Sequence, residues 1–347
     1  MVIMLGLGLG GCQEEYFPDL EKVEPILVVE GLVSNQPGPY RVKLSLAGRF
    51  QEPPVFNGVS GATVSIRVSD GNIVSLHEFS PGNYYTPIDF AGEVGKHYTL
   101  HISTPDGNQY KSTAQEILPP MSIDSIYGVK SEKVFYKPSS VSNSLFPFNV
   151  TGTYAFISTS GSIANIRRFR YTSSMYVQYG VLISDIAVDN CWIKKSITNF
   201  QSSDLGVFSN LDGASQEIGF APLFANGLHF LGYPANLLYD QVRVMINRIY
   251  TLNPESYSFH KAKNDQLNTE GRIFDPISAQ LPGNISCIND PERVALGFFE
   301  ASSETIHTYR IVTNILQGTV NIIHLPSMEN IPLEGCLRND YPPFWVN

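Results

Sequence analysis

A covalent reaction is predicted at Cys12, because its thiol follows a short apolar stretch and two glycines. The order Leu9, Gly10, Gly11, Cys12 resembles a bacterial lipobox, in which the cysteine thiol receives a diacylglycerol. The two glycines let a signal peptidase grip an extended backbone. Two or three acyl chains bury enough methylene groups to make a stable anchor. We therefore expect lipidation at Cys12, with a chance cysteine behind an apolar start as the alternative.

The residues around Cys12 fit export to a membrane surface. Residues 1–11 are predicted to be a lipoprotein signal peptide, since the apolar run Val2–Gly11 is too short to span a bilayer. This run lacks the usual basic residue, which would fit a true start further upstream. Residues 12–24 are predicted to form a poorly ordered acidic tether. Its beginning, Gln13-Glu14-Glu15, resembles the surface-export signal of Bacteroidota lipoproteins, although a solvated tether would look the same.

Three further cysteines, Cys191, Cys287 and Cys336, would meet an oxidising compartment after export. Three thiols allow three different single disulfides and leave one thiol over. We favour a disulfide between Cys287 and Cys336, since both lie near the ends of the last cluster of predicted strands. Metal binding is disfavoured because no CxxC or Cys-His spacing accompanies these residues.

Other patterns that could carry chemistry are weak. The sequence has no GxSxG, P-loop, HExxH or DxDxDG motif, so we expect no catalytic residue, no metal and no cofactor besides the lipid. His97 and His101 lie four apart, but in a strand this spacing separates them by about 13 Å. Asp124-Ser125-Ile126 fits an O-glycosylation pattern of Bacteroidota secreted proteins, which makes Ser125 a candidate acceptor. The basic tract Arg167–Arg170 could bind an acidic ligand or headgroup, but an exposed strand start is the favoured interpretation.

The composition favours strands and turns over long helices. The 347 residues carry only 16% charged side chains and are rich in Gly, Pro, Tyr and Phe. The length allows about two domains. The formal net charge of -9 would repel phosphate backbones, so nucleic acid is disfavoured as a partner.

Period-two alternation and two Asp-Gly turns predict about seven strands in residues 25–118. Short antiparallel strands at this density are typical of an Ig-like or transthyretin-like β-sandwich. Leu118-Pro119-Pro120 is predicted to be a linker after this domain. The strands are expected at 26–29, 40–46, 62–69, 73–79, 83–86, 97–102 and 109–114.

A larger β-rich domain with one short helix is predicted over residues 121–340. Asn253 is the expected N-cap of the helix, Pro254 its first residue and Gly271 its C-terminal stop. Strands are expected at 122–127, 154–158, 170–179, 241–250, 294–299, 309–313 and 320–325.

Two segments of this domain are candidate contact surfaces. Residues 199–216 are rich in Ser, Asp, Gly and Asn, which predicts a long loop. Residues 222–236 carry Phe224, Phe230 and Tyr233. The alternative for these three aromatic residues is a place in the core.

The order of motifs along nearly the whole chain resembles the Bacteroidota lipoprotein family called domain of unknown function 4249. The tail departs from the family pattern, which would have a second cysteine and more glycine near Cys336, and this weakens any disulfide assigned by analogy. The matching blocks after the lipobox are Pro25–Gly31, Gly38–Leu44, Gly61–Val64, Cys191-Trp192, Arg248 with Tyr257-Ser258-Phe259, Gln266, Gly271 and Phe274-Asp275-Pro276, Gly283-Asn284-Ile285, Leu296–Ser302, Cys336 and Pro343-Phe344-Trp345.

The resemblance implies no established catalysis and a place beside TonB-dependent outer-membrane receptors. Our first hypothesis is therefore a non-enzymatic accessory or binding subunit of an outer-membrane β-barrel complex, either a TonB-dependent transporter or an outer-membrane assembly machine. It would be lipid-anchored in the outer membrane, on the extracellular face. The alternative is a stand-alone glycan-binding or adhesion lipoprotein on the cell surface. A third hypothesis is a hydrolase whose site is assembled from distant residues.

Overall fold

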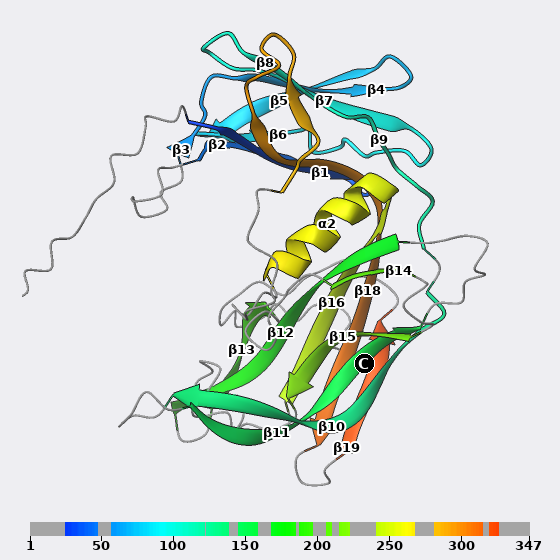
Figure 1. The fold of residues 1–347 in the computed structure, drawn as a ribbon. Helices are drawn as coiled ribbons and strands as arrows, with labels where there is room; N and C mark the ends of the chain where they lie inside the picture. Colours follow the sequence, from blue (N-terminus) through cyan, green and yellow to red (C-terminus); the bar gives the residue numbers. More distant parts are fainter. Residues whose placement is uncertain are drawn as a thin grey trace, which may run out of the picture.

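A computed structural model of the chain describes residues 25–47, 57–121, 123–138, 145–158, 168–184, 187–196, 206–209, 215–222, 241–267, 281–314 and 319–325. These residues form a mainly β structure with a single helix, as the sequence predicts (Figure 1). Within these ranges, no helix is both long enough and apolar enough to cross a membrane.

The first part of the chain forms nine strands whose buried residues alternate. In the second strand, Val42 and Leu44 are fully buried while Arg41 is exposed, which is the predicted period-two pattern. The strands are β1 (Leu27–Ser34), β2 (Arg41–Leu46), β3 (Asn57–Gly58), β4 (Thr63–Val68), β5 (Ile73–Ser80), β6 (Asn83–Tyr85), β7 (His97–Ser103), β8 (Gln109–Ser112) and β9 (Gln115–Glu116).

These strands form a curled sheet around one apolar core. The order along the sheet is β1, β2, β6, β5, β4, β7, β8, and β5 connects its two halves by pairing with both β6 and β4. Val29 and Leu44 from one half share a core cluster with Ile66 and Leu100 from the other. Two halves that face each other across a shared core agree with the β-sandwich expected for this part of the chain.

Two segments from much later in the chain extend this sheet. β17 (Ile285–Cys287) pairs antiparallel with β8. β18 (Ala295–Asn314) pairs in parallel with β1, from Leu27 opposite Ala295 to Ser34 opposite Ser302. Ile285, Cys287 and Phe299 belong to the same core cluster as the early strands. The first part of the chain therefore shares its core with residues beyond 280.

The later strands form the rest of this sheet and a separate one. β10 (Ser125–Pro138), β11 (Leu145–Ser158) and β15 (Ser215–Pro222) make a three-stranded sheet. The large sheet continues from β18 through β16 (Gln241–Leu252) and β12 (Arg168–Ser184) to β13 (Ala187–Ser196), while β19 (Thr319–Leu325) pairs with β18 and β14 (Gly206–Ser209) pairs with β12.

The strand β14 lies inside the segment predicted to be a loop, residues 199–216. That prediction is wrong for Gly206–Ser209, whose backbone pairs with Arg168–Tyr171 of β12, and for Ser215 and Gln216, which begin β15. Composition favoured a loop there, but a partner strand satisfies the backbone hydrogen bonds whatever the side chains prefer. The other segment, 222–236, lies outside the described residues apart from Pro222 at the end of β15.

The long strand β18 passes from one part of the molecule to the other. Residues 295–302 pair with β1, and residues 303–313 pair antiparallel with β16. The sequence predicts two separate strands here, at 294–299 and 309–313. That separation is wrong, since Glu300, Ser302, Ser303 and Glu304 are all buried inside one continuous strand.

The helix α2 (Pro254–Leu267) begins at the predicted residue and lies between the two parts (Figure 1). Asn253 caps it, because its Oδ1 accepts a hydrogen bond from the backbone N–H of Ser256 at 2.8 Å. Gln115 Oε1, at the start of β9, accepts bonds from Asn253 Nδ2 and Ser256 Oγ at 2.8 and 3.0 Å. The start of the helix is thus tied to the first part of the chain. The predicted stop, Gly271, lies outside the described residues.

Candidate functional site

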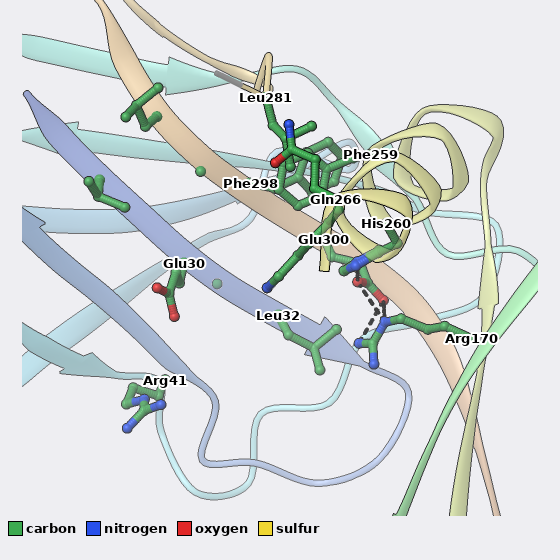
Figure 2. A pocket seen from close by; sticks show the side chains of 15 residues that line it. Glu30, Leu32, Arg41, Arg170, Phe259, His260, Gln266, Leu281, Phe298 and Glu300 are labelled. Atoms are coloured by element: carbon green, nitrogen blue, oxygen red, sulfur yellow. Dashed lines mark hydrogen bonds and ion pairs between the residues drawn. The ribbon is translucent and has the colours of Figure 1, made fainter. Parts of the chain in front are cut away.

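A hollow of about 740 Å³ lies between α2 and the outer face of β1, β2 and β18 (Figure 2). This volume falls within the usual range of small-molecule sites. Helix residues form one wall, called the roof here, and strand residues form the other, called the floor. Among the described residues, one helix covers part of a sheet face that is wider than the helix, which leaves the hollow beside it.

The floor consists of side chains that point away from the apolar core. Leu27 and Val29 of β1 face the core, so the alternate residues Val28, Glu30 and Leu32 face outward into the hollow. The parallel register places Leu296, Phe298 and Glu300 of β18 opposite these three residues, in that order. Arg41, at the start of β2, completes the floor beside β1.

The roof is one face of α2, formed by Phe259, His260, Lys263 and Gln266. These positions are spaced by one, three and three residues, which places them on one side of a helix. The Phe259 ring stacks on Phe298 of the floor, with ring centroids 4.5 Å apart and planes 20° apart. Figure 2 shows this stack at one side of the hollow. The aromatic pair therefore joins the roof to the floor.

A buried ion cluster closes another side of the hollow. Arg170 donates from Nε and Nη2 to the two carboxylate oxygens of Glu300, each at 3.0 Å, and His260 Nε2 lies 2.5 Å from Glu300 Oε2. The side chains of Arg170 and Glu300 are only 8% and 4% exposed. The hydroxyl of Ser302 also donates to Glu300, at 2.5 Å. This cluster links β12, β18 and α2, as the dashed lines in Figure 2 show.

The carboxylate of Glu300 is held in its charged form by these neighbours. Burial would raise its pKa, but the charge of Arg170 and the hydrogen bond from His260 outweigh that effect and hold the pKa far below its usual range. The Arg170 guanidinium also lies over the Tyr250 ring, with its Cζ atom 3.8 Å from the ring centroid. A bidentate, stacked arginine of this kind fixes the geometry of the cluster.

A second buried carboxylate, Glu304, lies four residues further along β18. It accepts hydrogen bonds from Arg248 Nη1 at 2.5 Å, Ser34 Oγ at 3.0 Å and Tyr250 OH at 3.5 Å. Burial, followed by the charge of Glu304, raises the pKa of Tyr250 to about 12. The clusters around Glu300 and Glu304 therefore connect β1, in the first part of the chain, to β12, β16, β18 and α2 in the later part. We call these two clusters together the charge-paired joint.

Three other charged side chains line the hollow and take no part in these ion clusters. Arg41, Lys263 and Glu30 are exposed, and within the described residues none of them forms an ion pair. The Nδ1 atom of His260 is buried and also lacks a hydrogen-bond partner there. Apolar walls with a few free polar groups are typical of sites that bind small molecules.

The residues singled out from the sequence do not gather at this hollow. Cys12 and Cys336 lie outside the described residues. Cys287 is buried in β17 and its thiol lies 3.3 Å from Asn289 Oδ1, so its pairing with Cys336 stays a prediction. The backbone of Cys191 lies in β13. Ser125 is exposed at the start of β10, and its glycosylation stays a prediction as well.

The two histidines four residues apart lie in β7, as predicted for a strand. His97 lies 3.9 Å from Glu116, and burial together with Arg67 and Lys111 lowers the pKa of His101. Within the part of the chain that the structure describes, no cluster of His, Cys, Asp and Glu could hold a metal.

Among the patterns considered for chemistry, the basic tract reaches the hollow, and the family blocks Pro25–Gly31 and Leu296–Ser302 also contribute to its lining. The interpretation of Arg167–Arg170 as an exposed strand start is wrong for Arg170, which is buried with Glu300. Arg168 lies 5.6 Å from the centroid of the Tyr257 ring on α2. The sequence analysis assigned no role to Glu300 or His260, because their partner Arg170 is distant in the sequence.

The structure thus defines a mainly β protein with a charge-paired joint and an amphipathic hollow. The family model of the Domain of unknown function (DUF4249) matches residues 13–308, and the chain belongs to that family. A comparison with curated proteins gave no match.

Proposed function

We propose that the protein is a cell-surface lipoprotein of the outer membrane and a non-enzymatic accessory or binding subunit of a β-barrel complex. The barrel would be a TonB-dependent transporter or an outer-membrane assembly machine. The observation that carries the proposal is the position of the family domain. Its match begins at residue 13, directly after the candidate lipidated residue Cys12. The described body up to residue 308 would then follow the anchor as one family domain.

A short tether would confine this body close to the membrane. Fourteen residues separate Cys12 from the start of β1 at Leu27, and a chain of that length spans at most about 50 Å. Two proteins held in one membrane plane meet at a much higher effective concentration than in free solution. A weak contact with a neighbouring barrel would therefore be sufficient for a stable complex.

Affinity purification from outer membranes tests this proposal. The full chain with a C-terminal tag would be purified in mild detergent, beside a Cys12→Ser variant that cannot be acylated. We expect a β-barrel protein in near one-to-one amount with the wild type, and its loss with Cys12→Ser. A control with an unrelated tagged surface lipoprotein removes barrels that are merely abundant. A lipidated wild-type protein that is purified alone would refute the proposal.

The alternative, a stand-alone glycan-binding or adhesion lipoprotein, is favoured by one surface feature. Phe79 on β5 is 86% exposed and meets Tyr85 of β6 edge to face, with ring centroids 6.0 Å apart. Ile88 is 74% exposed close by in the sequence. Exposed aromatic rings can stack on sugar rings, so a glycan array should bind the wild type and lose the signal with Phe79→Ala. An array with no signal above background would remove the reason for this alternative.

A further inference from the structure

We propose that the hollow between α2 and the outer face of β1, β2 and β18 binds a small amphipathic organic anion. The ligand would have an apolar body and a carboxylate or phosphate group. This inference goes beyond the proposed function, because it requires neither the lipid on Cys12 nor a barrel. It follows from the walls of the hollow, its uncommitted charges and its rigidity.

The walls provide an apolar surface on both sides of the hollow. Leu32, Leu296 and Phe298 come from the floor, and Phe259 comes from the roof. Leu281, which follows α2 in the chain, also contributes to the lining. A ligand with an apolar body would remove this surface from water, which favours binding in proportion to the area covered.

The uncommitted charges select an anionic group. Within the described residues, Arg41 on the floor and Lys263 on the roof are exposed and form no ion pair, and Glu30 is the only free carboxylate of the lining. Glu300 does not change this balance, because its charge is paired with that of the buried Arg170 guanidinium. Two free cations against one carboxylate attract an anion and repel a cation of the same shape.

The positions of these charges also predict the orientation of the bound ligand. Arg41 of β2 lies on one side of the strand β1 and the Phe259–Phe298 stack lies on its other side, with Glu30 of β1 between them (Figure 2). The anionic group would lie between Arg41 and Lys263, while the apolar body would lie toward the aromatic stack. The Nδ1 atom of His260, which has no partner among the described residues, could bond to a second polar group of the ligand.

The joint around the hollow keeps its walls in place before a ligand arrives. The Arg170–Glu300–His260 cluster fixes the roof to the floor, and Gln115 fixes the start of the helix. A site that is already formed loses little conformational entropy on binding. The buried cluster therefore positions the site, and the exposed Arg41 and Lys263 contact the ligand.

The test is a direct binding measurement on the full chain carrying Cys12→Ser, so that neither lipid nor detergent competes for the hollow. Isothermal titration would use laurate, dodecyl phosphate and 1-naphthoate as anionic probes, below any micelle concentration. Dodecyltrimethylammonium is the matched cation. We expect one-to-one saturable binding of at least one anion and no comparable binding of the cation. The acyl and aromatic probes distinguish the two kinds of apolar body.

Variants of the free cations make the result specific to the hollow. Lys263→Gln and Arg41→Gln should each weaken binding of the anion about threefold to tenfold, since a partly exposed charge-assisted hydrogen bond is lost. Lys263→Glu should abolish it. Lys261→Gln, an exposed lysine of the same helix that does not line the hollow, should have no effect. The inference is overturned if no anion binds saturably, if the cation binds as well, or if the Lys263 and Arg41 variants bind like the Lys261 control.

Discussion

At the scale of single residues, the central feature is a carboxylate that is buried and still charged. Glu300 is 4% exposed and has donors from Arg170, His260 and Ser302 around it. Taking one carboxylate out of water costs several kcal/mol unless its partners are close and well oriented. The cost of burying Glu300 is therefore offset only when all three of its partners are present.

Removing the charge of Glu300 should strongly destabilise the fold. Glu300→Gln keeps the shape of the side chain but leaves the buried Arg170 guanidinium without a counter-charge, which we expect to cost about 3 kcal/mol of unfolding free energy. Urea unfolding followed by circular dichroism measures the change. Asp70→Asn, which breaks the exposed pair with Lys96, is the control and should leave the midpoint almost unchanged. Equal midpoints for both variants would contradict a structural role for the cluster.

The same residue predicts how stability depends on pH. The pKa of Glu300 lies below its ordinary value of 4.5 in the folded protein, so the folded state holds the proton less tightly than the unfolded state. Its stabilising contribution is therefore complete above about pH 5 and decreases as the pH falls through 4.5 toward the lowered value. The loss approaches about 1.4 kcal/mol per pH unit for one proton. Urea unfolding from about pH 7 to about pH 3 should show a shallower decline for Glu300→Gln than for wild type, and parallel curves would disprove the assignment.

The residues of this cluster show the limit of reading one sequence. Arg170 stood out as part of a basic tract, but nothing near it in the sequence marks Glu300 or His260 as its partners. The separation between Arg170 and Glu300 is 130 residues, and only the sheet order β12, β16, β18 brings them together. A charged residue is normally exposed, so a pattern of side-chain types places it at the surface by default.

At the scale of elements, local sequence patterns predicted the strands of residues 25–118 well. Arg41–Leu46 and Thr63–Val68 alternate strictly, and the structure forms β2 and β4 over those residues. The helix was also predictable, because Asn253 and Pro254 are local start signals. β18 was not, since its buried polar centre has its partners, such as Arg248, Ser34 and Arg170, on other elements. Local signals cannot report such tertiary contacts.

The pairing of β1 with β18 depends on a glycine. Gly297 has a φ of +90°, and a Cβ atom there would meet the backbone carbonyl oxygen of Val29. Gly297→Ala should therefore lower the unfolding free energy by about 3 kcal/mol, from backbone strain and the forced separation of the strands together.

A second glycine separates those two causes. Gly107 has a φ of +86° with no atom near its added Cβ, so Gly107→Ala should show the conformational cost alone, about 1 kcal/mol. Denaturant unfolding of both variants measures the difference. If Gly107→Ala costs as much as Gly297→Ala, close approach of β1 and β18 is not the reason for the glycine.

At the scale of the whole molecule, the two parts are joined by more than a linker. β18 pairs with β1 in its first half and with β16 in its second half, so one sheet runs through both parts. The ion cluster around Glu300 and the hydrogen bonds of Gln115 cross the same joint. A hollow formed at such a joint depends on both parts, which explains why no single stretch of sequence indicates it.

The domain boundary predicted between residues 118 and 121 can be tested by expressing residues 25–121 alone. This fragment would lack β17 and β18, and with them Ile285, Cys287 and Phe299 of its core, and the edge of β1 would be unpaired. We expect it to be unfolded or aggregated, with narrowly dispersed amide signals in an NMR spectrum. Fusing residues 281–302 to its C-terminus through a flexible linker should restore dispersed signals, because both missing strand segments return. A well-folded fragment 25–121 would show instead that the early strands form an independent domain and that β17 and β18 only add to its edges.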